Sequence, residues 1–196
     1  MRALVLVDLQ YDFLPGGALA VPRGDETIPV AQRLMPEFEV VVATQDWHPR
    51  DHKSFAANTP GAQVGEIREV NGLLQVMWPV HCVQGTHGAE LHEDLDGITQ
   101  VFQKGTNPEL DSYSGFFDNG HKKATGLEGW LREQGVTDLT VLGLATDYCV
   151  KFTVLDARQL GFAVTVVSAG CRAVDLAPGD GERALEDMRA AGAVIE

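Results

Sequence analysis

Residues 138–150 read DLTVLGLATDYCV and join a run of strand-forming residues directly to a cysteine. The run at 138–144 is dominated by aliphatic and β-branched residues, which favours a parallel strand buried on both faces. A helical pattern follows at 147–160, and it stops before Gly161, a usual residue just beyond the end of a helix. A buried strand that leads straight into a helix predicts an α/β fold.

The same alternation extends in both directions along the chain. We expect further strands at 3–7, 39–44, 99–103, 163–168 and 193–195, of which the run at 99–103 is the weakest. We expect further helices at 26–35, 121–134 and 181–191, with Asp25 as an N-cap and with Pro36, Gly135 and Gly192 as the residues that end them. The pattern predicts one domain over residues 1–196: a doubly wound, mainly parallel six-stranded sheet with helices on both faces, in three layers. The stretch 46–98 shows little regular pattern, and so long a loop in a compact domain is usually functional.

Composition excludes several classes of protein. The formal net charge of -13 argues against binding to nucleic acid, because phosphates repel an acidic surface. No apolar run reaches about 18 residues, so we expect no membrane span. The start of the chain, MRALVLVDLQ, has no small-residue cleavage site, and the three cysteines are scattered. Both features predict a cytoplasmic protein, and its size and class are compatible with a homo-oligomer.

Reactive residues follow four of the expected strands. Open α/β sheets bind ligands at the carboxyl ends of their strands, so residues at those ends are candidates for a site. In chain order, the ends of the first four strands carry Asp8, then Asp46 with His48, then Lys104, then Cys149. Four such ends on one edge of a sheet predict an active site there.

Cys149 is the candidate nucleophile. Thr146 or Asp147 can cap the helix that follows, which places Cys149 in the first turn, where free N–H groups and the helix dipole favour a thiolate. We expect Lys104 to lower the thiol pKa further and Asp8 to take the thiol proton. A nucleophile, a cation and a base are the groups that covalent acyl transfer requires. The alternative is a buried structural cysteine. For Cys82 and Cys171, a structural role is the one expected.

A second set of residues has the pattern of a metal site. In extended backbone, Asp46 and His48 share a face, and Pro49 favours that backbone at His48. His81 lies in WPVHC, and His52 is a further candidate. Two histidines and a carboxylate suit one divalent ion; zinc is favoured, with iron and manganese as alternatives.

The motifs LVLVDLQYDFLPGGALAV, VVATQDWHP, WPVHC, FQKGTNPELDSYSGF and GLATDYCV occur in this order. Together they resemble the nicotinamidase (pyrazinamidase) family of isochorismatase-like cysteine hydrolases, over nearly the whole chain. The resemblance implies hydrolysis of nicotinamide to nicotinate and ammonia in NAD salvage, and of pyrazinamide as well, with a pyridine carboxamide as the small-molecule partner.

The resemblance also implies roles for individual residues. It assigns the catalytic triad to Asp8, Lys104 and Cys149, and the metal ligands to Asp46, His48 and His81. It implies a cis peptide before Ala145, so that the N–H groups of Ala145 and Cys149 form an oxyanion hole. The residues that would border the substrate are Phe13, Trp78 and Tyr113.

Two details differ from the family pattern. His52 follows His48 by four residues, a spacing different from that in members with a fourth ligand from this loop. The segment VVSAGCRAVD lacks an acidic residue often seen before its cysteine.

Three alternatives stay open from the sequence. They are a related amidase for carbamoyl or maleamate-type substrates, a hydrolase in which the metal supplies the nucleophile, and a non-catalytic pyridine-binding protein.

Overall fold

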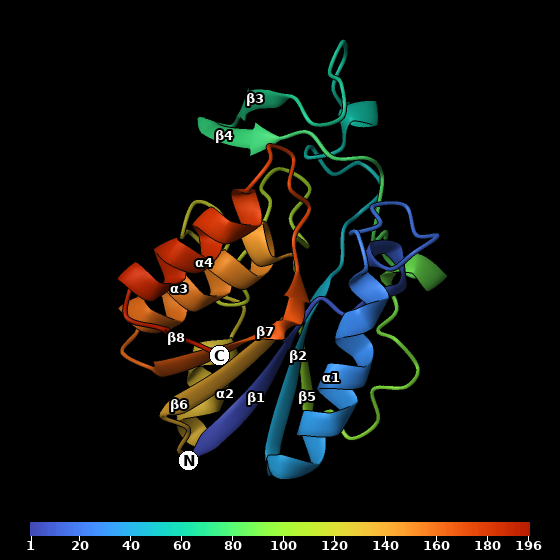
Figure 1. The fold of residues 1–196 in the computed structure, drawn as a ribbon. Coiled ribbons are helices and arrows are strands. Elements are labelled where there is room, and N and C mark those ends of the chain that lie inside the picture. The colour runs from blue at the N-terminus through green and yellow to red at the C-terminus, as the bar shows by residue number, and fades with distance from the viewer.

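A six-stranded sheet forms the centre of the molecule (Figure 1). The computed structural model describes residues 1–196. All strand pairs of this sheet are parallel, in the order β5-β2-β1-β6-β7-β8, so the predicted doubly wound α/β architecture is confirmed. The strands are β1 (Arg2–Val7), β2 (Val40–Asp46), β5 (Gln100–Lys104), β6 (Asp138–Leu144), β7 (Ala163–Arg172) and β8 (Val194–Ile195).

Four α-helices cover the two faces of the sheet. They are α1 (Thr27–Leu34), α2 (Leu127–Glu133), α3 (Lys151–Gln159) and α4 (Asp180–Ala190). The helix α1 covers one face, and α3 and α4 pack side by side on the other (Figure 1). None of them is long and apolar enough to cross a membrane.

Two predicted helices begin later than expected. The helix predicted at 121–134 starts only at Leu127, because the Asp118 carboxylate accepts the N–H groups of Gly120 and Lys122 and holds that segment in a turn. The helix predicted at 147–160 is α-helical only from Lys151. Before it, Thr146–Val150 forms a π-helical turn that contains Cys149.

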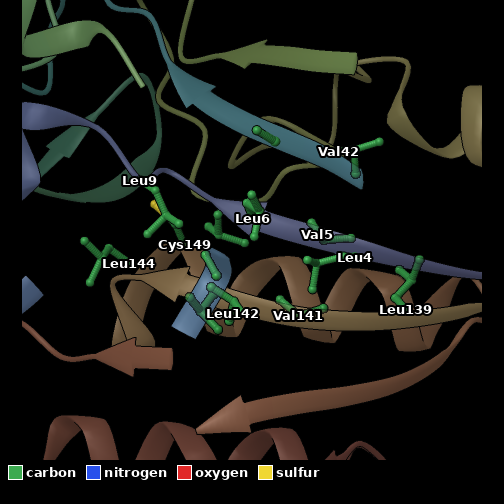
Figure 2. Close-up of a cluster of buried hydrophobic side chains, with 14 of the residues drawn as sticks. Leu4, Val5, Leu6, Leu9, Val42, Leu139, Val141, Leu142, Leu144 and Cys149 are labelled. Carbon is green, nitrogen blue, oxygen red and sulfur yellow. The ribbon is translucent and has the colours of Figure 1, made fainter. Parts of the chain in front are cut away.

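The apolar core is centred on the two middle strands of the sheet, β1 and β6. Residues 3–7 of β1 are completely buried, and Val5 of β1 lies opposite Val42 of β2 on one side and Val141 of β6 on the other. Figure 2 shows this apolar cluster, which includes Cys149. The close approach of β6 to β1 requires glycine at position 143, because a Cβ there would lie 2.1 Å from the carbonyl oxygen of Val7.

The stretch 46–98 is more regular than predicted. It contains an antiparallel hairpin of β3 (Ile67–Val70) and β4 (Leu73–Val76), joined by Asn71 and Gly72, both at positive φ. Asn-Gly is the usual dipeptide of such a two-residue turn, so the signal was present in the sequence. The hairpin lies beyond the carboxyl ends of the central strands, at the opposite end of the molecule from both termini (Figure 1).

Candidate active site

The carboxyl edge of the sheet brings together the predicted strand-end residues. Asp8 follows β1, Asp46 and Lys104 end β2 and β5, and Cys149 lies in the turn after β6. Because these four strands are neighbours, their ends meet, and ligand atoms of Asp8, Asp46 and Cys149 lie within 4.8 Å of one another. All four side chains are buried.

Lys104 is the cation at the centre of this group. Its Nζ lies 2.8 Å from Asp8 Oδ2 and 2.5 Å from Asp46 Oδ1, and it donates to the carbonyl oxygen of Ser112 at 3.0 Å. The sulfur of Cys149 is 3.3 Å away. Burial alone lowers the pKa of Lys104, but the two carboxylates outweigh it, and the pKa lies well above its ordinary value. Lys104 is therefore a permanent positive charge between base and nucleophile.

Replacing this cation is expected to destabilise the fold. Lys104→Met keeps most of the side-chain volume but leaves two buried carboxylates without their cation, and breaking a buried pair in this way costs about 3–5 kcal/mol. The matched control is Lys151→Met, which removes an exposed pair with Asp187 at 2.6 Å and is expected to cost less than about 1 kcal/mol. Urea unfolding of both variants measures the difference. Equal losses would contradict this account of Lys104.

The local structure around Cys149 corrects two sequence predictions. Neither Thr146 nor Asp147 caps the following helix, since no side chain bonds to the turn's first N–H groups. The predicted lowering of the thiol pKa is also wrong. Burial raises the pKa of Cys149 well above its ordinary value, and Asp8 and Asp46 add to the rise although Lys104 opposes it. The resting group is thus a neutral thiol, which a base must deprotonate during the reaction.

Asp8 is built to act as that base. Its Oδ1 accepts the hydroxyl of Thr44 at 2.6 Å, whereas its buried Oδ2 accepts no hydrogen bond and lies only in the ion pair with Lys104. Burial raises the pKa of Asp8, Lys104 opposes the rise, and the net direction is upward. A carboxylate with a raised pKa is a stronger base, and Oδ2 is the oxygen free to take a proton.

The backbone beside Cys149 offers a free donor. The peptide between Leu144 and Ala145 is cis, in agreement with the family pattern. No hydrogen bond within the protein uses the Ala145 N–H, although Ala145 is buried. A free N–H next to a nucleophile is the kind of group that stabilises a developing oxyanion.

The three predicted metal ligands converge on one point. Asp46 Oδ2 lies 3.5 Å from Nε2 of His48 and 3.9 Å from Nε2 of His81. The Nδ1 atoms of these histidines face the carbonyl oxygens of Gly105 at 2.9 Å and Pro79 at 2.7 Å. A carbonyl only accepts, so each Nδ1 carries a proton and each Nε2 points at the cluster, the usual orientation of metal-binding histidines.

The charge of the centre also suits a divalent cation. Burial and the neighbouring His48 lower the pKa of His81 to about 4, so it is neutral and able to bind a metal at neutral pH. Asp111, which the sequence did not indicate, is a third buried carboxylate close to His48. Asp8, Asp46 and Asp111 thus place three carboxyl groups in a centre that holds one lysine, Lys104. The carboxylate and imidazole donors of this centre fit a divalent ion.

His52 lies beside this cluster and not in it. Its ring centroid is 4.4 Å from that of His48, and it groups with His48 and Asp111. Its Nδ1 pairs with Ser54 Oγ at 2.7 Å, and its buried Nε2 makes no hydrogen bond. His52 thus shares His48 with the predicted ligands but groups with Asp111, and its role as a metal ligand stays a prediction.

A single methyl group at position 105 should displace a metal ligand. Gly105 has a φ of +63°, and a Cβ there would lie 2.3 Å from Cε1 of His48. Gly105→Ala is therefore expected to weaken metal affinity about 10-fold or more, the scale on which disturbed supports of metal ligands act. Gly135→Ala is the matched control, because its φ of +71° carries the same backbone cost and nothing lies within 4 Å. Metal titration of both variants measures this difference in affinity. Equal metal affinities of Gly105→Ala and Gly135→Ala would contradict the role given to His48.

An apolar pocket opens between the thiol and the metal cluster. The predicted residues Phe13, Trp78 and Tyr113 line it. So do five residues that the sequence did not single out as substrate-binding: Leu19, Val21, Asp111, Tyr148 and Val174. The rings of Trp78 and Tyr148 meet edge-on at 4.9 Å, and Trp78 Nε1 donates to the Tyr113 hydroxyl at 3.2 Å. The pocket is lined by aromatic rings and has Cys149 and Asp46 in its wall.

The hairpin also takes part in this pocket. Gln75 of β4 is buried, and its Nε2 lies 3.1 Å from both Asp111 Oδ2 and the Tyr113 hydroxyl. The long stretch that the sequence marked as functional therefore supports two pocket residues.

The chain is similar to known proteins over nearly its whole length. The isochorismatase domain family matches residues 2–196. A nicotinamidase of Escherichia coli K12 is 53% identical over 200 residues, which cover 99% of this chain and 93% of that protein. A solved structure of a nicotinamidase and pyrazinamidase from Acinetobacter baumannii superposes with a TM-score of 0.95 at 46% identity, covering 99% and 94% of the two chains. A pyrazinamidase of Pyrococcus horikoshii, solved with zinc, has a TM-score of 0.83 at 39% identity, covering 100% and 98%.

Proposed function

The chain belongs to the isochorismatase family, and we propose that it is a nicotinamidase that hydrolyses nicotinamide to nicotinate and ammonia. The observation that carries the mechanism is the single pocket that joins Cys149, Asp46 and His81. An apolar, aromatic-lined pocket with a thiol and a metal cluster in its wall suits an aromatic ring that carries a carboxamide and a ring nitrogen.

In the first half of the reaction, Cys149 forms a bond to the carboxamide carbon. Asp8 Oδ2 takes the thiol proton, and Lys104 stabilises the resulting negative charge 3.3 Å from its Nζ. Charge grows on the carbonyl oxygen, where the N–H groups of Ala145 and Cys149 would meet it; losing one such donor typically costs about 3–4 kcal/mol. Asp8 returns the proton to the leaving nitrogen, so ammonia departs and a thioester remains.

In the second half, water breaks the thioester. Asp8 accepts a proton from the water as it attacks the thioester carbon, and the same N–H groups stabilise the oxyanion again. The carbon–sulfur bond breaks, the thiol regains its proton, and nicotinate leaves. One carboxylate thus serves as base and acid in both halves, which agrees with its raised pKa.

We propose Asp46, His48 and His81 as the residues that hold a divalent ion, with zinc favoured because the pyrazinamidase of similar structure was solved with zinc. When bound, such an ion supplies a Lewis-acidic position for the pyridine nitrogen and so orients the ring. Orientation of this kind lowers the activation barrier by several kcal/mol, and by up to about 7–11 kcal/mol in the best intramolecular cases. Phe13, Trp78 and Tyr113 form the walls that hold the ring in place.

Two further parts of the proposal rest on the same features. Pyrazinamide offers a ring nitrogen in the equivalent position, so we expect it to be hydrolysed as well. The three cysteines are free, which suits the reducing cytoplasm that the sequence predicts.

The test of this function is ammonia release by the purified, metal-loaded protein. We expect rapid hydrolysis of nicotinamide and much slower hydrolysis of benzamide, which has the same carboxamide but no ring nitrogen. Faster hydrolysis of N-carbamoyl compounds or maleamate would identify the other amidase class. Binding of nicotinamide without any ammonia release would identify a binding protein.

A further inference from the structure

Asp147 connects the turn that carries the nucleophile to a loop from another part of the chain. It lies two residues before Cys149, and its side chain is buried. Its Oδ1 accepts the N–H of Val174 at 3.0 Å, and its Oδ2 accepts the N–H of Asp175 at 2.8 Å. Both oxygens of a buried carboxylate are thus used to hold the segment between β7 and α4.

The same loop is fixed at a second point. Asp175 Oδ1 accepts the N–H of Gly181, in the first turn of α4, at 2.8 Å. A Cβ at position 181 would lie 2.6 Å from Cβ of Ala173, so α4 approaches the loop very closely. The loop therefore has one anchor on α4, while Asp147 anchors it to the active-site turn.

Val174, one of the two residues held by Asp147, lines the substrate pocket together with Ala145, Tyr148 and Cys149. Of the two anchors of the loop, Asp147 is the one that ties this wall to the turn that carries the sulfur. We propose that Asp147 is a positioning residue that holds Val174 against the substrate ring and so sets the size of ring that the pocket admits. This inference rests on the proposed function for the identity of the ring.

The kinetic test compares Asp147→Asn, Val174→Ala and the double variant. An asparagine keeps the size of the side chain but turns an N–H₂ group toward a backbone N–H, so the wall should move away. We expect KM for nicotinamide to rise about 10-fold or more, as for lost apolar contact in a pocket, with little change in kcat. Discrimination against a nicotinamide methylated on the ring should fall. The double variant should be no worse than Val174→Ala, because both changes remove the same wall.

The matched control is Asp180→Asn. Its carboxylate also accepts a loop N–H, that of Ala177 at 2.8 Å, but neither residue lines the pocket. It should leave KM and the discrimination unchanged. Additive effects in the double variant, a fall in kcat alone, or a Val174→Ala protein with unchanged KM and discrimination would each overturn the proposal. The measurement on Val174→Ala tests the proposal even if the Asp147→Asn protein does not fold.

A second readout needs no substrate. Hydrogen exchange at the amides of Val174 and Asp175 should be faster in Asp147→Asn than in the wild type and in Asp180→Asn. Unchanged exchange would overturn the proposal. If the wild type released no ammonia from nicotinamide, the proposed function would fail, while the exchange rates would still decide whether Asp147 holds the loop.

Discussion

Replacing Cys149 by alanine is expected to abolish hydrolysis of nicotinamide, with a fall in kcat of about 10⁴-fold or more, the range found when a catalytic nucleophile is removed. The physical reason is that the carboxamide carbon has no other nucleophile within the pocket wall that is paired with a base. Asp8 and Lys104 remain in the variant but have no thiol to activate. The measurement is ammonia release under substrate saturation.

Cys149→Ser separates this mechanism from a hydrolase in which the metal supplies the nucleophile. A serine hydroxyl is a far weaker acid than a thiol, so Asp8 cannot deprotonate it readily, and activity should again be lost. Cys171→Ser is the control, because Cys171 is also buried and free but lines no part of the pocket. Full activity in Cys149→Ser would contradict covalent catalysis by the thiol.

Removal of the metal is the second change with a large expected effect. Without the ion, nothing fixes the ring nitrogen, and the buried donor atoms of Asp46, His48 and His81 lose their shared partner. Loss of orientation of this kind lowers kcat/KM by about 100-fold or more. Stability should fall too: at a free metal concentration of about 1,000 times Kd, binding contributes about 4 kcal/mol to the free energy of unfolding. Thermal unfolding with and without a chelator measures it.

His81→Ala should reproduce most of the fall in kcat/KM and most of the loss of stability, because it removes one ligand from the cluster. His92→Ala is the matched control, since His92 pairs with Asp94 at 3.8 Å near the surface and belongs to no metal-binding group. An unfolding temperature of wild-type protein that does not respond to the chelator would contradict the metal site.

Much of the fold and of the site was predictable because it depends on local pattern. The runs at 3–7 and 138–144 are apolar because both strands are central and buried on both faces, and parallel strands necessarily end on one edge. Asp8, Asp46, Lys104 and Cys149 could be found from that rule alone. Asp46 and His48 are two residues apart in extended backbone, so their position on one face was also predictable from the sequence.

What could not be predicted depends on contacts between distant segments. Val174 enters the pocket from a loop with no motif of its own, and nothing within the motif at 102–116 marks Asp111 as a pocket residue; only the folded chain brings both to the pocket. The thiol pKa was predicted in the wrong direction, because the effect of Lys104 was visible in the sequence but the extent of burial was not. Asp147 looked like a helix cap because its actual partners, the N–H groups of Val174 and Asp175, lie 27 and 28 residues away.

The central claim is that a sulfur nucleophile and a metal cluster act on the two ends of one small molecule. The most direct measurement is a crystal structure of metal-loaded Cys149→Ala with nicotinamide bound. We predict that the ring nitrogen faces the ion held by Asp46, His48 and His81, and that the carboxamide carbon lies next to position 149. Nicotinamide bound away from that ion, or with its carboxamide turned away from position 149, would contradict the account.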